Sequence, residues 1–212
     1  MHDKDDPFFD MDDEHTIIKP NPRGRPQAQQ RRPQRQAEPG RKVDLSSRPG
    51  LNPLEKAAST LLNLLSQIRN TSSHPNPTGL HKQLADEIKN FERNAQRAGI
   101  NDKTVFIARY VLCTTIDEFV MSTPWGASSI WNSQSLLSMF HKETRGGERF
   151  FQLLNKLNQD PARNIDILEL MYMCLSLGFQ GRYRVDPNGN NELAEIRESL
   201  YYTIRNQQEE TE

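Results

Sequence analysis

Residues 80–99 read LHKQLADEIKNFERNAQRAG, and this stretch decides the fold class. Its apolar side chains recur every three or four residues, which places them along one face of an α-helix. Gly99 comes directly after them, and glycine is the usual residue just beyond a helix C-terminus. The stretch therefore predicts an amphipathic helix that buries one face. The apolar positions are Leu80, Leu84, Ile88, Phe91, Ala95 and Ala98.

The helix before it has a clear start. Asn52-Pro53 pairs a favoured N-cap residue with the residue that best tolerates the first helical position, and Glu55 completes a capping box. Its apolar stripe predicts a buried face. The stripe consists of Leu54, Ala57, Ala58, Leu61, Leu62, Leu65 and Ile68.

The rest of the chain continues the helical pattern. Residues from about 102 to 121 are apolar on several sides, so this helix is expected at the centre of the fold. No stretch long enough to form a strand alternates apolar and polar residues with a period of two. The sequence therefore predicts an all-α fold, a bundle of about seven helices, with an ordered loop over 178–189. The remaining helices are predicted over 128–142, 147–159, 164–178 and 191–206.

The first 50 residues differ in composition from the rest. They hold seven of the thirteen prolines and few apolar residues, so they cannot offset the entropy cost of ordering. Residues 1–14 carry seven acids, whereas residues 19–48 carry nine bases and two acids. We expect a disordered, acidic-then-basic tail over 1–50; a short docking motif near Thr16-Ile17-Ile18 is the alternative. The folded domain is expected over 51–206, followed by a polar end over 207–212.

Several function classes find little support. The net charge of −1 gives no general attraction to nucleic acid or membrane. The acidic N-terminus lacks the apolar region of a signal peptide, and the longest apolar run, 168–179, is too short to span a bilayer. Cys113 and Cys174 form no CxxC motif and are expected to be buried thiols. No cofactor is expected.

The histidines do not suggest a metal site. His141-x-Glu143 lacks the additional cysteines or histidine that complete known zinc motifs. His81 is expected on the exposed face of its helix, and the other histidines fall in the tail or in a loop. We therefore expect no bound metal.

Asp117-Glu118 interrupts the central apolar helix and is the most interesting pair. Adjacent helical residues point about 100° apart, so the two carboxylates should not face each other as an acid–base pair. Buried acids need partners. These partners are either arginines, for which Arg182 and Arg184 are the candidates, or the N–H groups at the start of a neighbouring helix. The alternatives are an acidic notch that binds a basic partner, and catalysis.

Seven short motifs in a fixed order resemble one family. They are Asn52-Pro53-Leu54, 110–118 (YVLCTTIDE), 123–126 (TPWG), 135–143 (SLLSMFHKE), 146–151 (GGERFF), 168–175 (LELMYMCL) and 178–183 (GFQGRY). Over residues 51–205 the series is similar to the DotU/IcmH family, called TssL in type VI secretion systems.

The resemblance implies a cytoplasmic all-α domain of two packed sub-bundles that form a hook with a cleft. It implies a scaffold, not an enzyme, on the cytoplasmic face of the bacterial inner membrane. The implied partners are a TssM-like (IcmF) subunit, TssK-like and TssE-like baseplate proteins, and a second copy in a homodimer. Family members carry a C-terminal transmembrane helix that is absent here; either the chain was cut before it or this member lacks it.

Two other functions compete with the scaffold. One is a helical hydrolase that uses Glu118 and Glu143, and the other is a nucleic-acid binder that acts through its basic tail; no nucleic acid is expected for the scaffold. The candidate partner-binding residues of the cleft are Asp117, Glu118, Trp125, His141, Glu143, Arg182 and Arg184.

Overall fold

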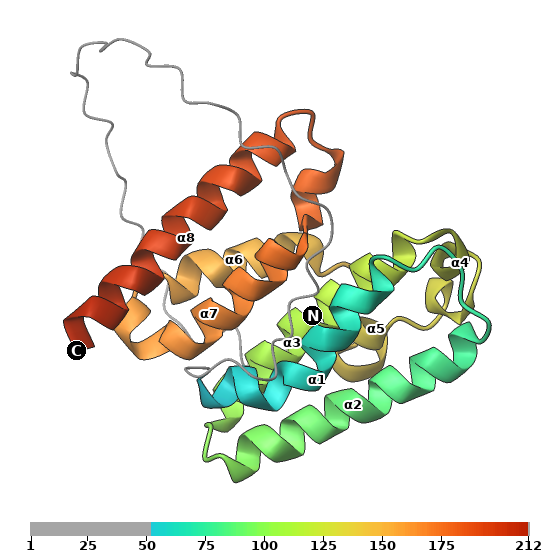
Figure 1. The fold of residues 1–212 in the computed structure, drawn as a ribbon, viewed down its shortest axis with the longest axis horizontal. Coiled ribbons are helices and arrows are strands. Elements are labelled where there is room, and N and C mark those ends of the chain that lie inside the picture. Colours follow the sequence, from blue (N-terminus) through green and yellow to red (C-terminus); the bar gives the residue numbers. More distant parts are fainter. Residues whose placement is uncertain (1–51, 212) are drawn as a thin grey trace, which may run out of the picture. The chain divides into compact units, whose positions relative to one another are not determined.

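A computed structural model describes residues 52–211. The side chains of residues 52–210 are included, and that of Thr211 is not. Within this range the chain forms helices and no strand, which confirms the all-α prediction (Figure 1). The tail predicted over 1–50 lies outside the described residues. The helices are α1 (Pro53–Ile68), α2 (Pro77–Arg97), α3 (Asp102–Met121), α4 (Pro124–Ala127), α5 (Leu136–His141), α6 (Gly147–Leu157), α7 (Pro161–Leu177) and α8 (Gly189–Thr211), with short 3₁₀ helices η2 (Ile130–Asn132) and η3 (Gly181–Val185).

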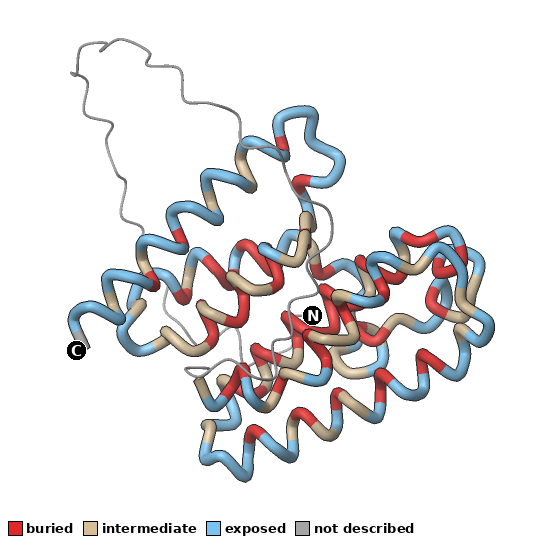
Figure 2. Tube along the Cα trace, in the orientation of Figure 1, coloured by how far each residue is buried: buried red, intermediate tan, exposed pale blue. Residues whose placement is uncertain are grey.

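The described helices form two packed groups. Helices α1 to α5 gather on one side, and α6 to α8 with η3 on the other (Figure 1). Helix α3 contacts α1, α2, α5, α6 and α7, and it is buried over most of its length (Figure 2). The all-round apolar sequence of this helix explains its central place, as expected.

Helix α1 begins as its sequence predicts. The Asn52 side chain accepts a hydrogen bond from the Glu55 N–H at 2.8 Å, and the Asn52 N–H donates to Glu55 Oε2 at 3.3 Å. Both halves of the capping box are therefore present. The apolar stripe is buried except for Ala57, which is half-buried.

The cap and the stripe of α1 should contribute unequally to stability. Asn52→Ala removes an N-cap and is expected to cost about 1 kcal/mol. Leu61→Ala is expected to cost roughly 2–5 kcal/mol, because Leu61 is 1% exposed and its removal leaves a cavity. Urea unfolding followed by circular dichroism measures both values. Equally small losses would show that α1 contributes little to the core.

Glu55 is buried among other acids at the start of α1. The Asn52 side-chain amide donates to Glu169 Oε2 at 2.5 Å, and Gln208 donates to Glu169 Oε1 at 2.6 Å. Burial first, and then the charge of Glu169, raise the pKa of Glu55 to about 7. This carboxyl group therefore binds a proton more tightly in the folded chain than in the unfolded chain.

That raised pKa predicts a pH dependence of stability. The folded state gains stability while Glu55 is protonated, and it loses that stability as the pH rises through about 7. Between about pH 5 and pH 8 the wild type should lose roughly 1–3 kcal/mol more than Glu55→Gln, which cannot titrate. Urea unfolding of both proteins across this range checks the prediction. Parallel curves for the two proteins would contradict it.

Four predicted elements differ from the structure in their extent. The single helix predicted over 128–142 is two short elements, η2 and α5, because Ser129 and Ser135 each cap a new start with their hydroxyl. Helix α7 begins at Pro161, three residues before the predicted start, with Asp160 as its N-cap, and its backbone is kinked at Asn164, where the predicted helix begins. The loop predicted over 178–189 contains η3, and α8 continues to Thr211.

Two side chains were misplaced in the prediction for α2. His81 is buried, not exposed, because its Nε2 forms a hydrogen bond of 2.8 Å with the carbonyl of Gln134 and its ring packs edge-on against Trp131. Ala98 is exposed, because α2 ends at Arg97. The two cysteines are free and buried, as expected.

Candidate partner-binding cleft

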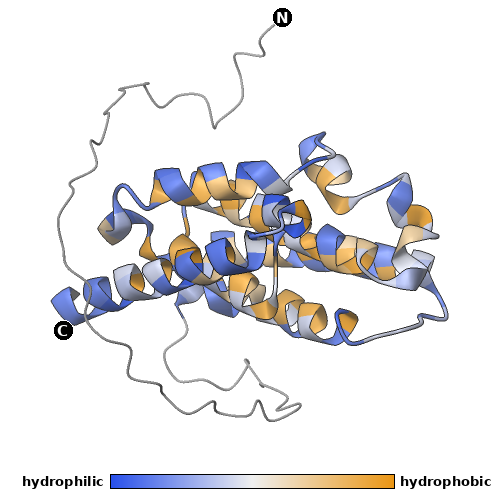
Figure 3. Cartoon of the chain, turned by 90° about the horizontal axis from the view of Figure 1, so that it is seen from above, coloured by the Kyte–Doolittle hydropathy of each residue, from blue (hydrophilic) through white to orange (hydrophobic). Residues whose placement is uncertain are grey.

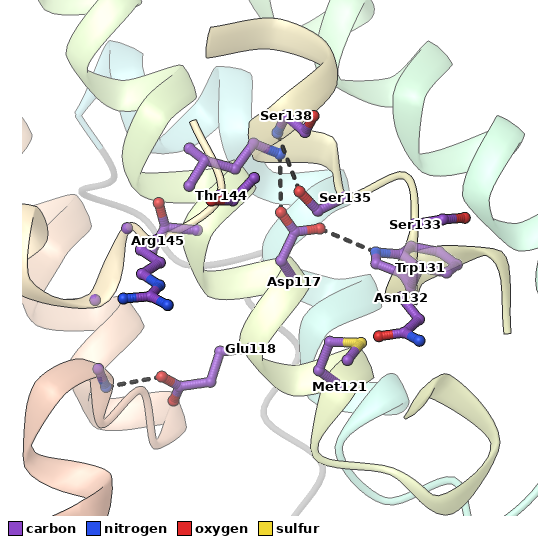
Figure 4. A pocket seen from close by; sticks show the side chains of 15 residues that line it. Asp117, Glu118, Met121, Trp131, Asn132, Ser133, Ser135, Ser138, Thr144 and Arg145 are labelled. Carbon is purple, nitrogen blue, oxygen red and sulfur yellow. Dashed lines mark hydrogen bonds between the residues drawn. The ribbon is translucent and has the colours of Figure 1, made fainter. Parts of the chain in front are cut away.

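A cleft of about 430 Å³ lies beside the C-terminal half of α3. Its walls come from α3, η2, α5, the start of α6 and Gly181 (Figure 4). Segments that lie far apart in the sequence therefore meet around it, and Asp117 and Glu118 both line it.

Asp117 ties α3 to η2 and α5. Its Oδ1 accepts hydrogen bonds from the Trp131 indole N–H and the Leu136 N–H, both at 2.9 Å. Its Oδ2 accepts from the Leu137 N–H at 2.8 Å. Because the first N–H groups of a helix lack partners within the helix, a carboxylate at this position satisfies them. Asp117 thus caps α5 together with Ser135, whose hydroxyl accepts from the Ser138 N–H.

Glu118 ties α3 to the start of η3. Its Oε1 accepts from the Gln180 N–H at 2.8 Å, and its Oε2 accepts from the Gly181 N–H at 2.7 Å. Gly181 has a φ of +53°, and a Cβ there would lie 2.7 Å from the Gly147 carbonyl oxygen. Only glycine fits this close approach without a shift. The two carboxylates therefore bond to different segments, as their angular separation predicts.

Burial perturbs both acids. It raises the pKa of Asp117 to about 6, while the N–H groups of Leu137, Leu136 and Trp131 act in the opposite direction. Burial also raises the pKa of Glu118, against the N–H groups of Gln180 and Gly181. With a pKa of about 6, Asp117 is mainly ionised at pH 7. Its oxygens are already occupied by donors, so it acts as a structural acceptor and not as a free base.

Neither acid forms the predicted ion pair with Arg182 or Arg184, although the charge of Arg184 helps to lower the pKa of Glu118 against the effect of burial. Arg184 donates to the Ser122 hydroxyl at 2.5 Å. Arg182 donates to the Tyr183 hydroxyl at 2.8 Å and lies over the rings of Tyr183 and Phe151. Neither arginine lines the cleft. For Asp117 the other predicted partner, the start of a neighbouring helix, is confirmed, because its carboxylate accepts from the first N–H groups of α5.

Trp125 also lies away from the cleft. Its indole N–H donates to the Thr71 carbonyl at 3.0 Å, and its ring lies 5.3 Å from that of His74. It therefore packs α4 against the α1–α2 loop. The tryptophan that lines the cleft is Trp131, which is 1% exposed.

His141 belongs to a separate polar network, not to the cleft lining. Arg109 donates to His141 Nε2 at 3.2 Å and to Glu92 Oε1 at 2.5 Å, which joins α2, α3 and α5. Burial first, and then the charges of Arg109 and Arg149, lower the pKa of His141 to about 4. The imidazole is therefore neutral at pH 7.

Glu143 holds the α5–α6 loop. It accepts from the Tyr110 hydroxyl at 2.7 Å and pairs with Arg149 at 2.9 Å. Glu118 and Glu143, the two carboxylates of the hydrolase hypothesis, therefore have separate sets of partners. The sequence argument for a shared site at these two residues finds no support in this geometry.

The sequence argument missed the exposed groups of the cleft. Asn132, Ser133 and Arg145 are exposed and line it. No periodicity or motif marks them, because each is an ordinary polar residue in a loop or at the end of a short 3₁₀ helix. The nearest signal is Gly146-Gly147 directly after Arg145, which marks the close approach of α6 to α3 and η3.

Residues 52–210 contain no group of three or more His, Cys, Asp or Glu residues that could hold a metal ion. No helix within this part of the chain is long and apolar enough to cross a membrane.

Comparison with known proteins gives a consistent result. A family model described as "Type VI secretion system protein DotU" matches residues 53–212. The crystal structure of TssL from Vibrio cholerae is 36% identical, with a TM-score of 0.68 over 75% of this chain and 99% of that chain. A comparison with curated proteins gives no match.

Two further structures share the fold at lower identity. The cytoplasmic domain of TssL from Acinetobacter baumannii is 24% identical, with a TM-score of 0.64 over 72% of this chain and 99% of that chain. SciP/TssL from enteroaggregative Escherichia coli 042 is 22% identical, with a TM-score of 0.59 over 68% and 85% of the two chains. At this level of identity they support the fold alone.

The fold and the cleft define a helical domain in which two half-buried acids, Asp117 and Glu118, join its segments. The chain belongs to the DotU family of type VI secretion system proteins. Members of this family are structural components of the secretion machinery.

Proposed function

We propose that this protein is a non-enzymatic scaffold of the type VI secretion inner-membrane complex, and that its cleft recruits a baseplate component. The proposal rests on the hydrogen bonds that the carboxylates of Asp117 and Glu118 accept. Both carboxylates are engaged by N–H groups from other segments, so they fix the walls of the cleft. A cleft with fixed walls suits recognition, because little conformational entropy is lost when a partner binds.

The groups left to meet a partner are those exposed at the cleft. Arg145 can pair with an acidic side chain, while Asn132 and Ser133 can donate and accept hydrogen bonds. The lining also includes buried Trp131 and Leu137, which give the cleft an apolar part. This combination of an apolar base and polar, exposed groups is typical of protein-binding surfaces.

Family membership supports the choice of partners. A TssK-like or a TssE-like baseplate protein is the proposed occupant of the cleft, and a TssM-like (IcmF) subunit is the proposed neighbour in the complex. The same membership supports a place on the cytoplasmic face of the inner membrane and a homodimer.

A binding measurement with a charge-reversal variant tests the proposal. Arg145→Glu in the full chain should weaken binding of a TssK-like or a TssE-like protein, each titrated separately, by at least about tenfold. Arg97→Glu, an exposed arginine at the end of α2, is the matched control and should bind normally. Thermal unfolding should be unchanged in both variants. Normal binding of both baseplate proteins by Arg145→Glu would exclude the cleft as the recruiting site.

A further inference from the structure

The start of α6 forms one end of the cleft. Arg145, Gly146 and Gly147 line the cleft there, and α6 begins at Gly147 with Gly146 as its N-cap residue. Within the described residues no side chain caps this helix, whereas the hydroxyl of Ser135 caps α5. The first N–H groups of a helix lack partners within the helix and carry a partial positive charge. The N–H groups of Gly147 and Glu148 therefore give this end of the cleft donors for a negatively charged group.

A buried polar side chain lies beside these groups. The described helices turn most hydrophobic residues inward and hydrophilic residues outward (Figure 3), and only five polar residues are buried in the described part of the chain. Four of them form hydrogen bonds, namely Glu55, His81, Thr115 and Thr123. The fifth is Thr114, which lines the cleft, is 5% exposed and has no partner for its Oγ1 within residues 52–210. Because a buried hydroxyl without a partner costs free energy, Thr114 points to a ligand group that binds it.

Thr114 and the start of α6 belong to one site. A Cβ added at Gly146 would clash with Thr114 Oγ1, so the hydroxyl lies directly against the N-cap residue of α6. Arg145 precedes Gly146, is exposed and forms no ion pair within residues 52–210. Hydroxyl, N–H and guanidinium groups all donate hydrogen bonds. The site therefore suits a ligand group that accepts hydrogen bonds.

Neighbouring acids limit the charge of that ligand group. Asp117 and Glu118 line the same cleft, and their oxygens accept from N–H groups of α5 and η3. Glu148 is exposed in the first turn of α6. These negative charges oppose a doubly charged anion such as phosphate more strongly than a singly charged carboxylate. A carboxylate also offers two oxygens in one plane, which match the guanidinium of Arg145.

We propose that the partner recruited by this cleft inserts one aspartate or glutamate side chain at the start of α6, an inference that rests on the proposed function. The carboxylate accepts hydrogen bonds from the N–H groups of Gly147 and Glu148 and from the Thr114 hydroxyl. It also pairs with Arg145. Each of these bonds has an ionised acceptor, so it is stronger than a bond between neutral groups. The contact gives Thr114 the partner that it lacks within residues 52–210.

Amide NMR of the full chain at constant ionic strength tests this site with a matched pair of small probes. Nα-acetylglutamate α-amide carries the side-chain carboxylate, and Nα-acetylglutamine α-amide has the same shape without the charge. The glutamate probe should shift the amide signals of Gly147 and Glu148 in a saturable manner and bind at least about fivefold more tightly than the glutamine probe. The amide of Gly79, which donates to the Asn76 side chain at 2.9 Å, should shift little. Equal affinity for the two probes, or no shift at the start of α6, would overturn the proposal.

Two threonine variants separate binding from a structural role. Thr114→Val removes the hydroxyl and should weaken binding of the glutamate probe at least about threefold, while the urea midpoint stays the same or rises. Thr115→Val removes a hydroxyl that donates to the Val111 carbonyl at 2.8 Å, so it should lower the urea midpoint and leave the probe affinity unchanged. Unchanged affinity in Thr114→Val would overturn the proposal. A fall in its urea midpoint as large as that of Thr115→Val would also overturn it, because the hydroxyl would then serve the fold.

Further probes and the baseplate proteins distinguish the other outcomes. Stronger shifts of the same amides with inorganic phosphate or with Nα-acetyllysine amide would overturn the assignment of a carboxylate. If Arg145→Glu weakens binding of the TssK-like or the TssE-like protein but the glutamate probe does not bind, the carboxylate assignment fails and the proposed function stands. If the probe binds as expected but neither baseplate protein binds the chain, the proposed function fails and the carboxylate site is upheld.

Discussion

Replacing Asp117 with alanine is expected to lower the free energy of unfolding by roughly 3–5 kcal/mol. The substitution leaves three donors without their acceptor, namely the Trp131 indole and the N–H groups of Leu136 and Leu137. Asp117→Asn should be intermediate, because one oxygen remains but the amide nitrogen faces an N–H donor. Urea unfolding followed by circular dichroism measures the change.

The matched control for this prediction is Asp86→Ala. Asp86 lies on the exposed face of α2 and pairs with Lys89 at 3.4 Å in solvent. Its loss should change the stability by no more than about 0.5 kcal/mol. A loss below about 1 kcal/mol for Asp117→Ala would contradict the structural role of this acid.

The second large effect is expected from Trp131→Ala, at roughly 3–5 kcal/mol. Trp131 is 1% exposed and packs edge-on against His81 at 4.7 Å, so truncation opens a cavity between η2 and α2. Trp131→Phe keeps most of the buried area, so it should lower the free energy of unfolding by less. It also removes the indole N–H that donates a hydrogen bond to Asp117. Urea unfolding compares the two variants. Equal losses for Ala and Phe would show that the hydrogen bond, and not packing, dominates.

The losses of stability caused by Asp117→Ala and Trp131→Ala should not be additive. Asp117 and Trp131 share a hydrogen bond of 2.9 Å, so the first substitution already removes part of what the second would remove. The double variant should be more stable than the sum of the single changes predicts, by about 0.5–3 kcal/mol. A double-mutant cycle from the same unfolding curves gives this coupling energy. Strict additivity would mean that the hydrogen bond contributes nothing to stability.

Periodicity and capping predicted the framework well, because both are local. The capping box at Asn52 and the apolar face of α2 from Leu80 to Ala95 depend on residues within one helix. The region 128–142 shows the limit of such local patterns, because its division into two elements involves a distant residue. Ser129 and Ser135 end one element and start the next through hydroxyl caps, and this choice depends on Asp117, which lies far away in the sequence.

The cleft could be predicted only in part. Apolar neighbours mark Asp117 and Glu118 as unusual, and the angle between them separates their roles. Apart from the Trp131 indole, their partners are backbone N–H groups, which every residue except proline carries and no sequence pattern reveals. Arg182, Arg184 and Trp125 were chosen for charge or size, yet their side chains bond elsewhere. Arg145 was missed because its position depends on how α6 packs.

Amide hydrogen exchange tests the central claim most directly, namely that the half-buried acids Asp117 and Glu118 hold the walls of the cleft in place. In the wild type, the amides of Leu136, Leu137, Gln180 and Gly181 should exchange slowly, because each donates to a carboxylate. Glu118→Ala should accelerate exchange at Gln180 and Gly181 and leave Leu136 and Leu137 protected. Fast exchange at all four amides in the wild type, or unchanged protection in Glu118→Ala, would contradict the claim.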